Sequence, residues 1–355
     1  LLIDDNEFVL GSNVDGVHIN ETSIQNAEIT NNRFVRDDDE TAYRSALNLS
    51  SDLVDTGDQT TVTIADNEVL GAESVLNITA NENNDENLDV EIDDNTIQLA
   101  ESALNGIDLT VDDVNSLSVV NNDFISIDDS DVEQFGTDGI ALNVTVNGDS
   151  EAGNVEIEEN EFTDIANQSL STAGTIGDAG TAIKLNGDAD GGNQAALALS
   201  GNQIQGSDVH INVTDSDFDS DDILSLISPN TVTPDVRILD NSEDVVDISR
   251  TDENDIAQAA AFGTITAGVI AADGGANEAV SAGPATYQET QIRVDKGIFV
   301  ESAEGPDATT FTTDTDEFFF NVSSNAEISG FTFSPTADDD QADVRLTSRA
   351  SNIVD

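Results

Sequence analysis

Short apolar runs alternate with polar turns along this chain, and one turn pattern recurs over residues 1–250. Each copy places an aliphatic residue before a polar turn centred on Asn, with an apolar residue shortly after it. The copies are Ile3–Phe8, Ile29–Phe34, Ile64–Val69, Ile92–Ile97, Val119–Phe124, Ile157–Phe162 and Leu199–Ile204, with a degenerate copy at Ile238–Ser242 around Asn241. This period predicts a solenoid, in which each coil buries its apolar face only against its neighbours.

Two more apolar runs accompany each Asn turn, and they alternate apolar and polar residues with the period of two that is typical of β-strands. Three short strands per coil, without helical periodicity, indicate a parallel stack of β-coils. The spacing between Asn turns varies from 26 to 42 residues, which we assign to external loops. The predicted loops are Arg36–Arg44, Asp128–Asp138, Asn167–Thr181 and Asp215–Thr233.

The repeated Ile-x-x-Asn-x-Phe turn, followed by Gly-Ile-x-Leu, resembles the right-handed parallel β-helix superfamily that includes pectate lyases. The resemblance implies an all-β, right-handed parallel β-helix solenoid in which the turn asparagines stack as a ladder. Asn tolerates the left-handed backbone conformation, and its amide can bond to the coils above and below. The expected ladder contains Asn6, Asn32, Asn67, Asn95, Asn122, Asn160 and Asn202.

The pattern breaks after about Thr251. Residues 251–282 are expected to form a linker and an apolar cap, and residues 283–355 resemble the first coils of another β-helix, with a Gly-x-Tyr-x-Glu-like start at Gly283–Glu289. The whole chain would then hold about eleven coils, which span roughly 50 Å at ~4.8 Å per coil.

The two ends of the sequence suggest self-association. Residues 342–355 resemble a coil lead-in, and residues 1–8 would continue it into the next Asn turn. We therefore expect units to meet head to tail, either as one period of a tandem protein or as subunits of a polymer. The alternative is a fragment whose ends make no such contact.

The composition indicates the salt conditions in which the protein works. The chain has 73 acidic and 10 basic residues, a net charge of −63, and molar salt would screen the resulting repulsion. This favours an extreme halophile over intrinsic disorder, because the apolar residues alternate regularly. The charge argues against nucleic acid and anionic membranes as partners. There is no Cys and no Met, and the small-residue stretch Ala257–Ala272 is too weak for membrane insertion.

Residues that could carry catalysis are better explained as structural, so no enzyme is predicted and no catalytic residue is assigned. Arg33, Arg36 and Arg44, close to Asp37–Asp39, are expected to form surface ion pairs. His18 and His210 are expected to point outward into solvent. Tyr287 and Glu289 are given structural roles.

Calcium is a secondary hypothesis for a cofactor. Asp215, Asp217, Asp219 and Asp221 present carboxylates at alternate positions, as calcium loops do, although acidic runs in a halophile are ordinarily solvated surface. Four Asn-x-Ser/Thr sites share one outward strand position with Asp108 and Lys184. They would carry glycans or form a polar face, and they are Asn48, Asn77, Asn143 and Asn212.

The leading functional hypothesis is a structural fibre, matrix or surface protein, extracellular or on the cell surface, that assembles end to end. The alternatives are a β-helix that binds or cleaves polysaccharide and a viral fibre.

Overall fold

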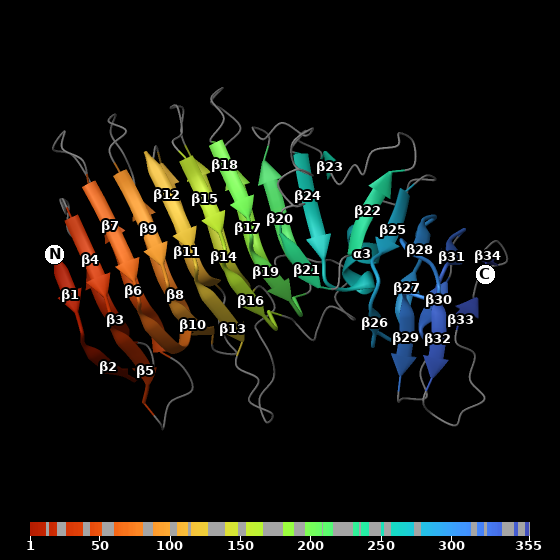
Figure 1. Cartoon of the computed structure of the whole chain (residues 1–355), viewed down its shortest axis with the longest axis horizontal. Coiled ribbons are helices and arrows are strands. Elements are labelled where there is room, and N and C mark those ends of the chain that lie inside the picture. Colours follow the sequence, from red (N-terminus) through yellow and green to blue (C-terminus); the bar gives the residue numbers. More distant parts are fainter. Residues whose placement is uncertain are drawn as a thin grey trace.

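The computed structural model shows one elongated stack of β-coils with the two termini at opposite ends (Figure 1). It describes residues 1–11, 14–19, 26–37, 43–51, 60–80, 88–99, 105–112, 115–126, 139–147, 154–165, 180–187, 196–207, 209–215, 230–233, 236–240, 250–251, 257–272, 278–313, 318–322, 325–335, 344–346 and 352–354. Nearly all paired strands in the stack are parallel, so the predicted all-β parallel solenoid is confirmed.

Three strand positions repeat along the first solenoid. The first is a seven-stranded parallel sheet of β1 (Leu2–Asp4), β4 (Asn26–Thr30), β7 (Thr60–Ala65), β9 (Leu88–Asp93), β12 (Ser116–Val120), β15 (Asn154–Glu158) and β18 (Ala196–Ser200). The second follows the Asn turn and contains β2 (Glu7–Leu10), β5 (Arg33–Arg36), β8 (Glu68–Ala80), β10 (Thr96–Leu99), β13 (Asp123–Ser126), β16 (Glu161–Thr163), β19 (Gln203–Gln205) and β21 (Thr231–Thr233).

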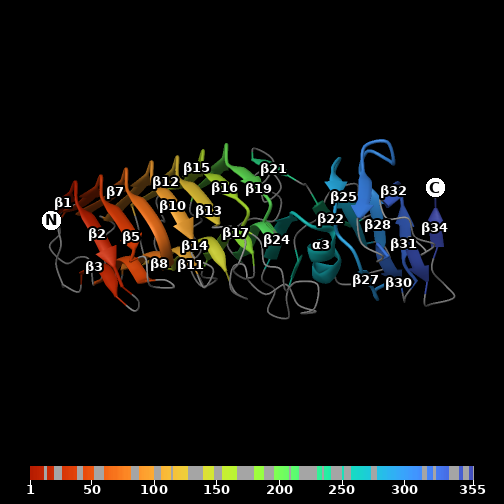
Figure 2. The ribbon, with the colours of Figure 1, turned by 90° about the horizontal axis from the view of Figure 1, so that it is seen from below.

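The third position contains β3 (Asp15–Ile19), β6 (Tyr43–Ser51), the second half of β8, β11 (Asn105–Asp112), β14 (Ile140–Asn147), β17 (Thr181–Gly187) and β20 (Val209–Asp215). Strand β8 spans two positions because Gly71, at φ 82°, turns the corner within it. Figure 2 shows the resulting layers from a second side.

The inward residues of these strands form one core along the first solenoid. Apolar residues recur at the same position in successive coils, and aromatic rings stack along the axis where neighbouring coils both carry Phe. The ring centroids of Phe124 and Phe162 lie 4.6 Å apart, and those of Phe8 and Phe34 lie 4.8 Å apart. Each coil therefore gains its apolar contacts mainly from its two neighbours.

Antiparallel strands interrupt the stack between the two solenoids. Strand β24 (Ala257–Phe262) pairs antiparallel with β20 and with the short β23 (Arg250–Thr251), and β22 (Val236–Asp240) pairs antiparallel with β25 (Glu278–Ala282). The degenerate turn predicted at Ile238–Ser242 begins in β22, as the other copies begin in a strand, but β22 pairs antiparallel with β25. Asn241 lies outside the described residues.

A short helix also lies in this junction. Helix α3 (Ile265–Ala271) occupies part of the stretch expected to be a linker and cap. Its Ile265, Ala267 and Val269 are buried in a second apolar core that begins at Val209. Gly268 packs closely enough that an added Cβ would lie 2.9 Å from a methyl group of Val280. No helix was predicted over these residues.

The second solenoid follows β25 and is again parallel. Strand β25 continues through β28 (Phe299–Ser302), β31 (Glu327–Ser329) and β34 (Asn352–Val354). The two other positions contain β26 (Thr286–Tyr287), β29 (Thr310–Thr313) and β32 (Thr332–Pro335), and β27 (Ile292–Val294), β30 (Phe320–Val322) and β33 (Val344–Leu346). Aromatic rings around Phe311 fill its core.

Candidate functional site

The turn asparagines form a continuous hydrogen-bonded ladder, as predicted. At each rung the side-chain Oδ1 accepts two bonds from the rung before it. Asn122 Oδ1, for example, accepts the backbone N–H of Asn95 at 3.1 Å and its Nδ2 at 2.9 Å. Asn122 in turn donates from its backbone N–H and Nδ2 to Oδ1 of Asn160. The ladder thus satisfies buried polar groups that would otherwise destabilise the coil corners.

The bonds between ladder side chains have a direction. At every rung the backbone N–H and Nδ2 donate to Oδ1 of the Asn on the carboxyl-terminal side. Nδ2 also donates to backbone carbonyls, such as Ile92 O in the preceding coil and Val120 O for Asn122. The Oδ1 acceptors therefore all face the amino-terminal side of the stack.

The left-handed conformation lies one residue earlier than expected. The residue that precedes each ladder Asn has a positive φ, as in Asp5 at 56°, Asn121 at 57° and Gly201 at 68°. The ladder asparagines themselves are absent from the positive-φ positions of the described chain. The expectation that the ladder Asn adopts αL is corrected: its neighbour turns the chain, and the Asn side chain is left to bond between coils.

An eighth rung was missed in the sequence. Asn230 accepts the backbone N–H of Asn202 at 3.2 Å and its Nδ2 at 2.8 Å. This residue lies within the stretch Asp215–Thr233 that was assigned to an external loop. The signal Asn230-Thr231-Val232 matches Asn95-Thr96-Ile97, but Pro229 precedes it where the other copies have a polar residue or Gly.

Acidic residues on the first sheet are separated along the stack. One register column holds Glu28, Thr63, Glu91, Ser118 and Glu156, so its carboxylates never occupy adjacent described coils. Two coil spacings hold such neighbours about 10 Å apart, near the Debye length at 0.1 M salt. The intervening positions reduce the like-charge repulsion that in-register stacking would otherwise impose.

Several of these carboxylates also accept bonds from the next coil. Ser116 Oγ and Asn115 Nδ2 each donate to Asp89 Oδ1 at 2.6 Å, and Ser200 Oγ donates to Glu158 at 2.7 Å. Bonds from Asn31 and Thr30 hold the pKa of Asp4 below its usual value. On the first sheet, acidic and donor residues thus occupy neighbouring coils, whereas Asp123 and Glu161 on β13 and β16 lie directly opposite each other.

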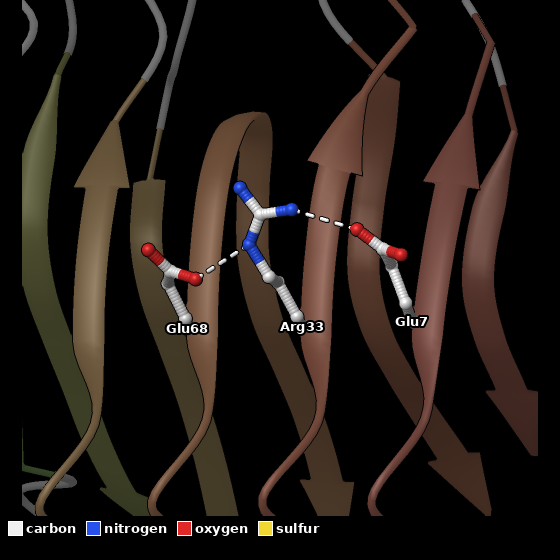
Figure 3. A network of polar contacts seen from close by, with 3 residues as sticks. All are labelled: Glu7, Arg33 and Glu68. Atoms are coloured by element: carbon white, nitrogen blue, oxygen red, sulfur yellow. Dashed lines mark hydrogen bonds and ion pairs between the residues drawn. The ribbon is translucent and has the colours of Figure 1, made fainter.

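Arg33 bridges two acidic residues on neighbouring coils (Figure 3). Its Nη1 lies 2.7 Å from Glu7 Oε1, and its Nε lies 2.7 Å from Glu68 Oε2. The three residues occupy one register column on β5, β2 and β8. The expected surface ion pair is present for Arg33. The side chain of Arg44 and the residues 38–39 lie outside what the structure describes.

Replacing Arg33 by glutamine should lower the free energy of unfolding only slightly, because the ion pairs are solvent-exposed. The loss should shrink further as salt is raised. Denaturant unfolding of Arg33→Gln at two salt concentrations measures both effects. A large loss that persists in molar salt would show that Arg33 does more than form surface ion pairs.

A polar stripe crosses the third strand position in register, as the sequence indicated. It runs from His18 to Asn212, and all members except His18 are partly buried. Its members are His18, Asn48, Asn77, Asp108, Asn143, Lys184 and Asn212. Asn143 Nδ2 donates to Asp108 at 2.9 Å, and Asn48 Oδ1 is buried without a partner. The glycosylation of these asparagines stays a prediction.

The two histidines differ in their exposure to solvent. His18 is exposed, with Nδ1 3.5 Å from Asp15, as expected for a solvated position. His210 is fully buried, and its Nδ1 lies 2.5 Å from Ser207 Oγ. The expectation that His210 points outward into solvent is wrong: β24 pairs antiparallel beside β20, and Gly263, directly after β24, lies close to the His210 ring.

The proposed calcium residues fall mostly outside the described chain. Asp215 ends strand β20, and Asp217, Asp219 and Asp221 lie beyond the described residues. Within the described part, no group of three or more His, Asp or Glu side chains is placed to hold a metal ion. The calcium hypothesis stays a prediction.

Glu289 and Lys296 hold the two ends of helix α3. The backbone N–H groups of Ile265 and Thr266 each donate to the Glu289 carboxylate at 2.7 Å. Lys296 Nζ donates to Ile270 O at 2.6 Å and to Ala272 O. Both charges have the sign that the helix dipole favours. Tyr287 donates to Gly283 O at 3.1 Å, so both predicted structural residues have such contacts.

Burial raises the pKa of Glu289, although bonds from Thr266 and Ile265 oppose the shift. A raised folded-state pKa adds stability that is complete below the unfolded-state pKa and is lost as pH rises through the folded-state value. Relative to Glu289→Gln, which does not titrate here, the wild type should therefore lose stability from about pH 4 upward. Unfolding free energies of both proteins across pH test this, and parallel curves would contradict it.

Within the described residues, no helix has the length and apolar character needed to cross a bilayer. Comparisons with known proteins return no match to any family model, any curated protein or any solved structure. The functional argument therefore rests on the geometry of this chain.

Proposed function

We propose that this protein is a structural component, extracellular or on the cell surface of a halophile, that assembles end to end by stacking of β-solenoid coils. The observation that carries the proposal is the regular stack of coils. Inward residues of internal coils, such as Ile29 and Phe34, have no exposed surface because the coils on both sides cover them, and the same Asn corner repeats from coil to coil.

Two other features support a structural role. The paired Arg33 and the capping contacts of Glu289 hold neighbouring elements of the stack together. The separated carboxylates of the first sheet suit an exterior that stays hydrated in concentrated salt.

Electron microscopy of the protein in molar salt, paired with its denatured mass, tests this function. Filaments should show an axial repeat of at least about 50 Å, from eleven coils at ~4.8 Å plus the junction. A denatured mass of one unit would indicate a polymer of subunits, and a much larger mass would indicate a tandem chain. Discrete monomers at all salt concentrations would contradict the proposal.

Binding of polysaccharide is the second candidate, and the polar stripe favours it. The seven stripe positions carry one acidic residue, Asp108, and one lysine, Lys184, in a chain with a net charge of −63. Amides and hydroxyls on a near-neutral face can bond to sugar hydroxyls. Affinity electrophoresis on neutral polysaccharide gels tests this, with Asn77→Ala and Asn143→Ala compared with Gln203→Ala on another face. Equal mobility of all variants would remove the candidate.

A further inference from the structure

We propose that the outward face of β2, β5, β8 and β10 is a side-to-side contact surface for a second copy of this chain, with the two stacks running in opposite directions. This contact goes beyond the proposed end-to-end assembly and does not depend on it, because it uses the side of the first solenoid. An apolar column, a self-complementary charge column and a local balance of charge support it.

An apolar column runs along the outward side of the second strand position. Val9, Val35 and Leu70 pair in register on β2, β5 and β8. The column continues through Gln98 to Ile125. Val35 and Leu70 are half-buried, and Ile125 is 37% exposed although coils flank it on both sides. Neighbouring apolar side chains on the surface of a soluble protein mark a contact surface.

The adjacent outward column is self-complementary in charge. It carries Glu7, Arg33, Glu68 and Thr96 in successive coils, and Figure 3 shows the first three together on one face. A two-fold axis parallel to the strands, between β5 and β8, would bring two copies face to face with the coil order reversed. Arg33 of each copy then faces Glu68 of the other, and Glu7 faces Thr96. No like charges oppose each other at these four levels.

The same axis matches the apolar column with itself. Val35 of one copy faces Leu70 of the other, and Val9 faces Gln98. Each contact occurs twice, once on either side of the axis, as in other isologous contacts. Two β-sheets that pack face to face lie about 10 Å apart, so the outward side chains of both copies would meet between them.

This surface lacks the charge that would keep two copies apart. Its strand segments contain two glutamates and two arginines and are therefore neutral, in a chain with a net charge of −63 and only ten basic residues. These segments are residues 7–10, 33–36, 68–70 and 96–99. Repulsion between the remaining surfaces of the two copies is strong in dilute buffer and is screened in molar salt. We therefore expect the contact to form only at high salt.

The size of the surface predicts a weak contact. Four coils and four residues of each strand cover about 19 Å by about 13 Å, or roughly 250 Å². A stable interface buries about 800 Å² on each partner. Two isolated units should therefore associate reversibly, and the contact should become persistent only where many copies lie side by side.

Charge-reversal variants test the facing pairs. Arg33→Glu and Glu68→Arg would each set like charges opposite each other, so each variant alone should have a dissociation constant raised by about tenfold or more. A mixture of the two variants restores opposite charges at both pairs and should associate as the wild type does. Sedimentation equilibrium at the lowest salt concentration at which the wild type associates measures these constants. Circular dichroism of each variant checks that it is folded.

Leu70→Lys places a charge in the apolar column and should weaken association to a similar extent. Val120→Lys, on the outward side of the first sheet, is the matched control and should leave association unchanged. Where the units form filaments, electron microscopy should show wild-type filaments in antiparallel pairs and Leu70→Lys filaments running singly.

Single wild-type filaments, or a mixture that associates no better than either charge variant alone, would overturn the side-to-side contact and leave the end-to-end function standing. Dimers of the wild type without filaments, weakened by Leu70→Lys, would support this contact and contradict the end-to-end function. A wild type that stays monomeric at all salt concentrations would overturn both.

Discussion

Replacing Asn122 by leucine should lower the free energy of unfolding by about 3–5 kcal/mol. The side chain is fully buried, and its Oδ1 accepts two bonds from Asn95. Leucine leaves the Asn95 backbone N–H and the Ile92 carbonyl without this partner, and each orphaned group costs about 1–3 kcal/mol. Denaturant unfolding in molar salt, followed by far-ultraviolet circular dichroism, measures the loss.

Two companion variants separate the ladder from side-chain volume. Gln203→Leu, exposed on β19, should change stability by no more than about 0.5 kcal/mol. Asn122→Asp keeps an acceptor for Asn95 but buries a charge and loses the donor to Ile92. Its defect should therefore shrink at acid pH, where the carboxyl is protonated. If Asn122→Leu unfolded at the same denaturant concentration as the wild type, the ladder would not hold the coils together.

Replacing Phe162 by alanine should cost about 3–5 kcal/mol, as for other buried Phe to Ala changes. Phe162 has no exposed surface and stacks on Phe124 at 4.6 Å with an interplanar angle of 6°. The substitution removes the ring and leaves a cavity between two coils. Because each coil contacts only its neighbours, the coils on either side should unfold less cooperatively.

Calorimetry and limited proteolysis check this second result. We expect a broadened or split thermal transition, with new cleavage in the segments next to β16. Phe162→Leu fills most of the space and should show a smaller loss with a single transition. A single sharp transition in Phe162→Ala, at the wild-type temperature, would mean that the coils do not depend on this stack.

The Asn turns were predictable because each combines a polar corner with alternating apolar strands. Alternation assigns inward and outward sides, so the register of the polar stripe from Asn48 to Asn212 could be predicted. The ladder could be predicted for the same reason. Sequence alone does not show which of two adjacent polar residues turns the chain, and the left-handed residue was placed one position too late.

The errors cluster where neighbouring coils stop being parallel. Pro229, which replaces the polar residue or Gly of the other copies, made the rung at Asn230 hard to recognise. His210 was misplaced because alternation predicts only the face of a strand and not the β24 strand that covers it. Helix α3 is built from small residues that carry no clear helical period, and contacts from Glu289 and Lys296 hold it.

In the first solenoid, the geometry of the Asn corners does not depend on the number of residues in each coil. Successive ladder rungs lie between 26 and 42 residues apart, yet each rung repeats the same bonds. Additional residues can therefore accumulate between corners without shifting the register of the next coil. In evolutionary terms, such a stack tolerates insertion and exchange of surface segments. The same property makes it a scaffold into which foreign peptides could be grafted at regular intervals.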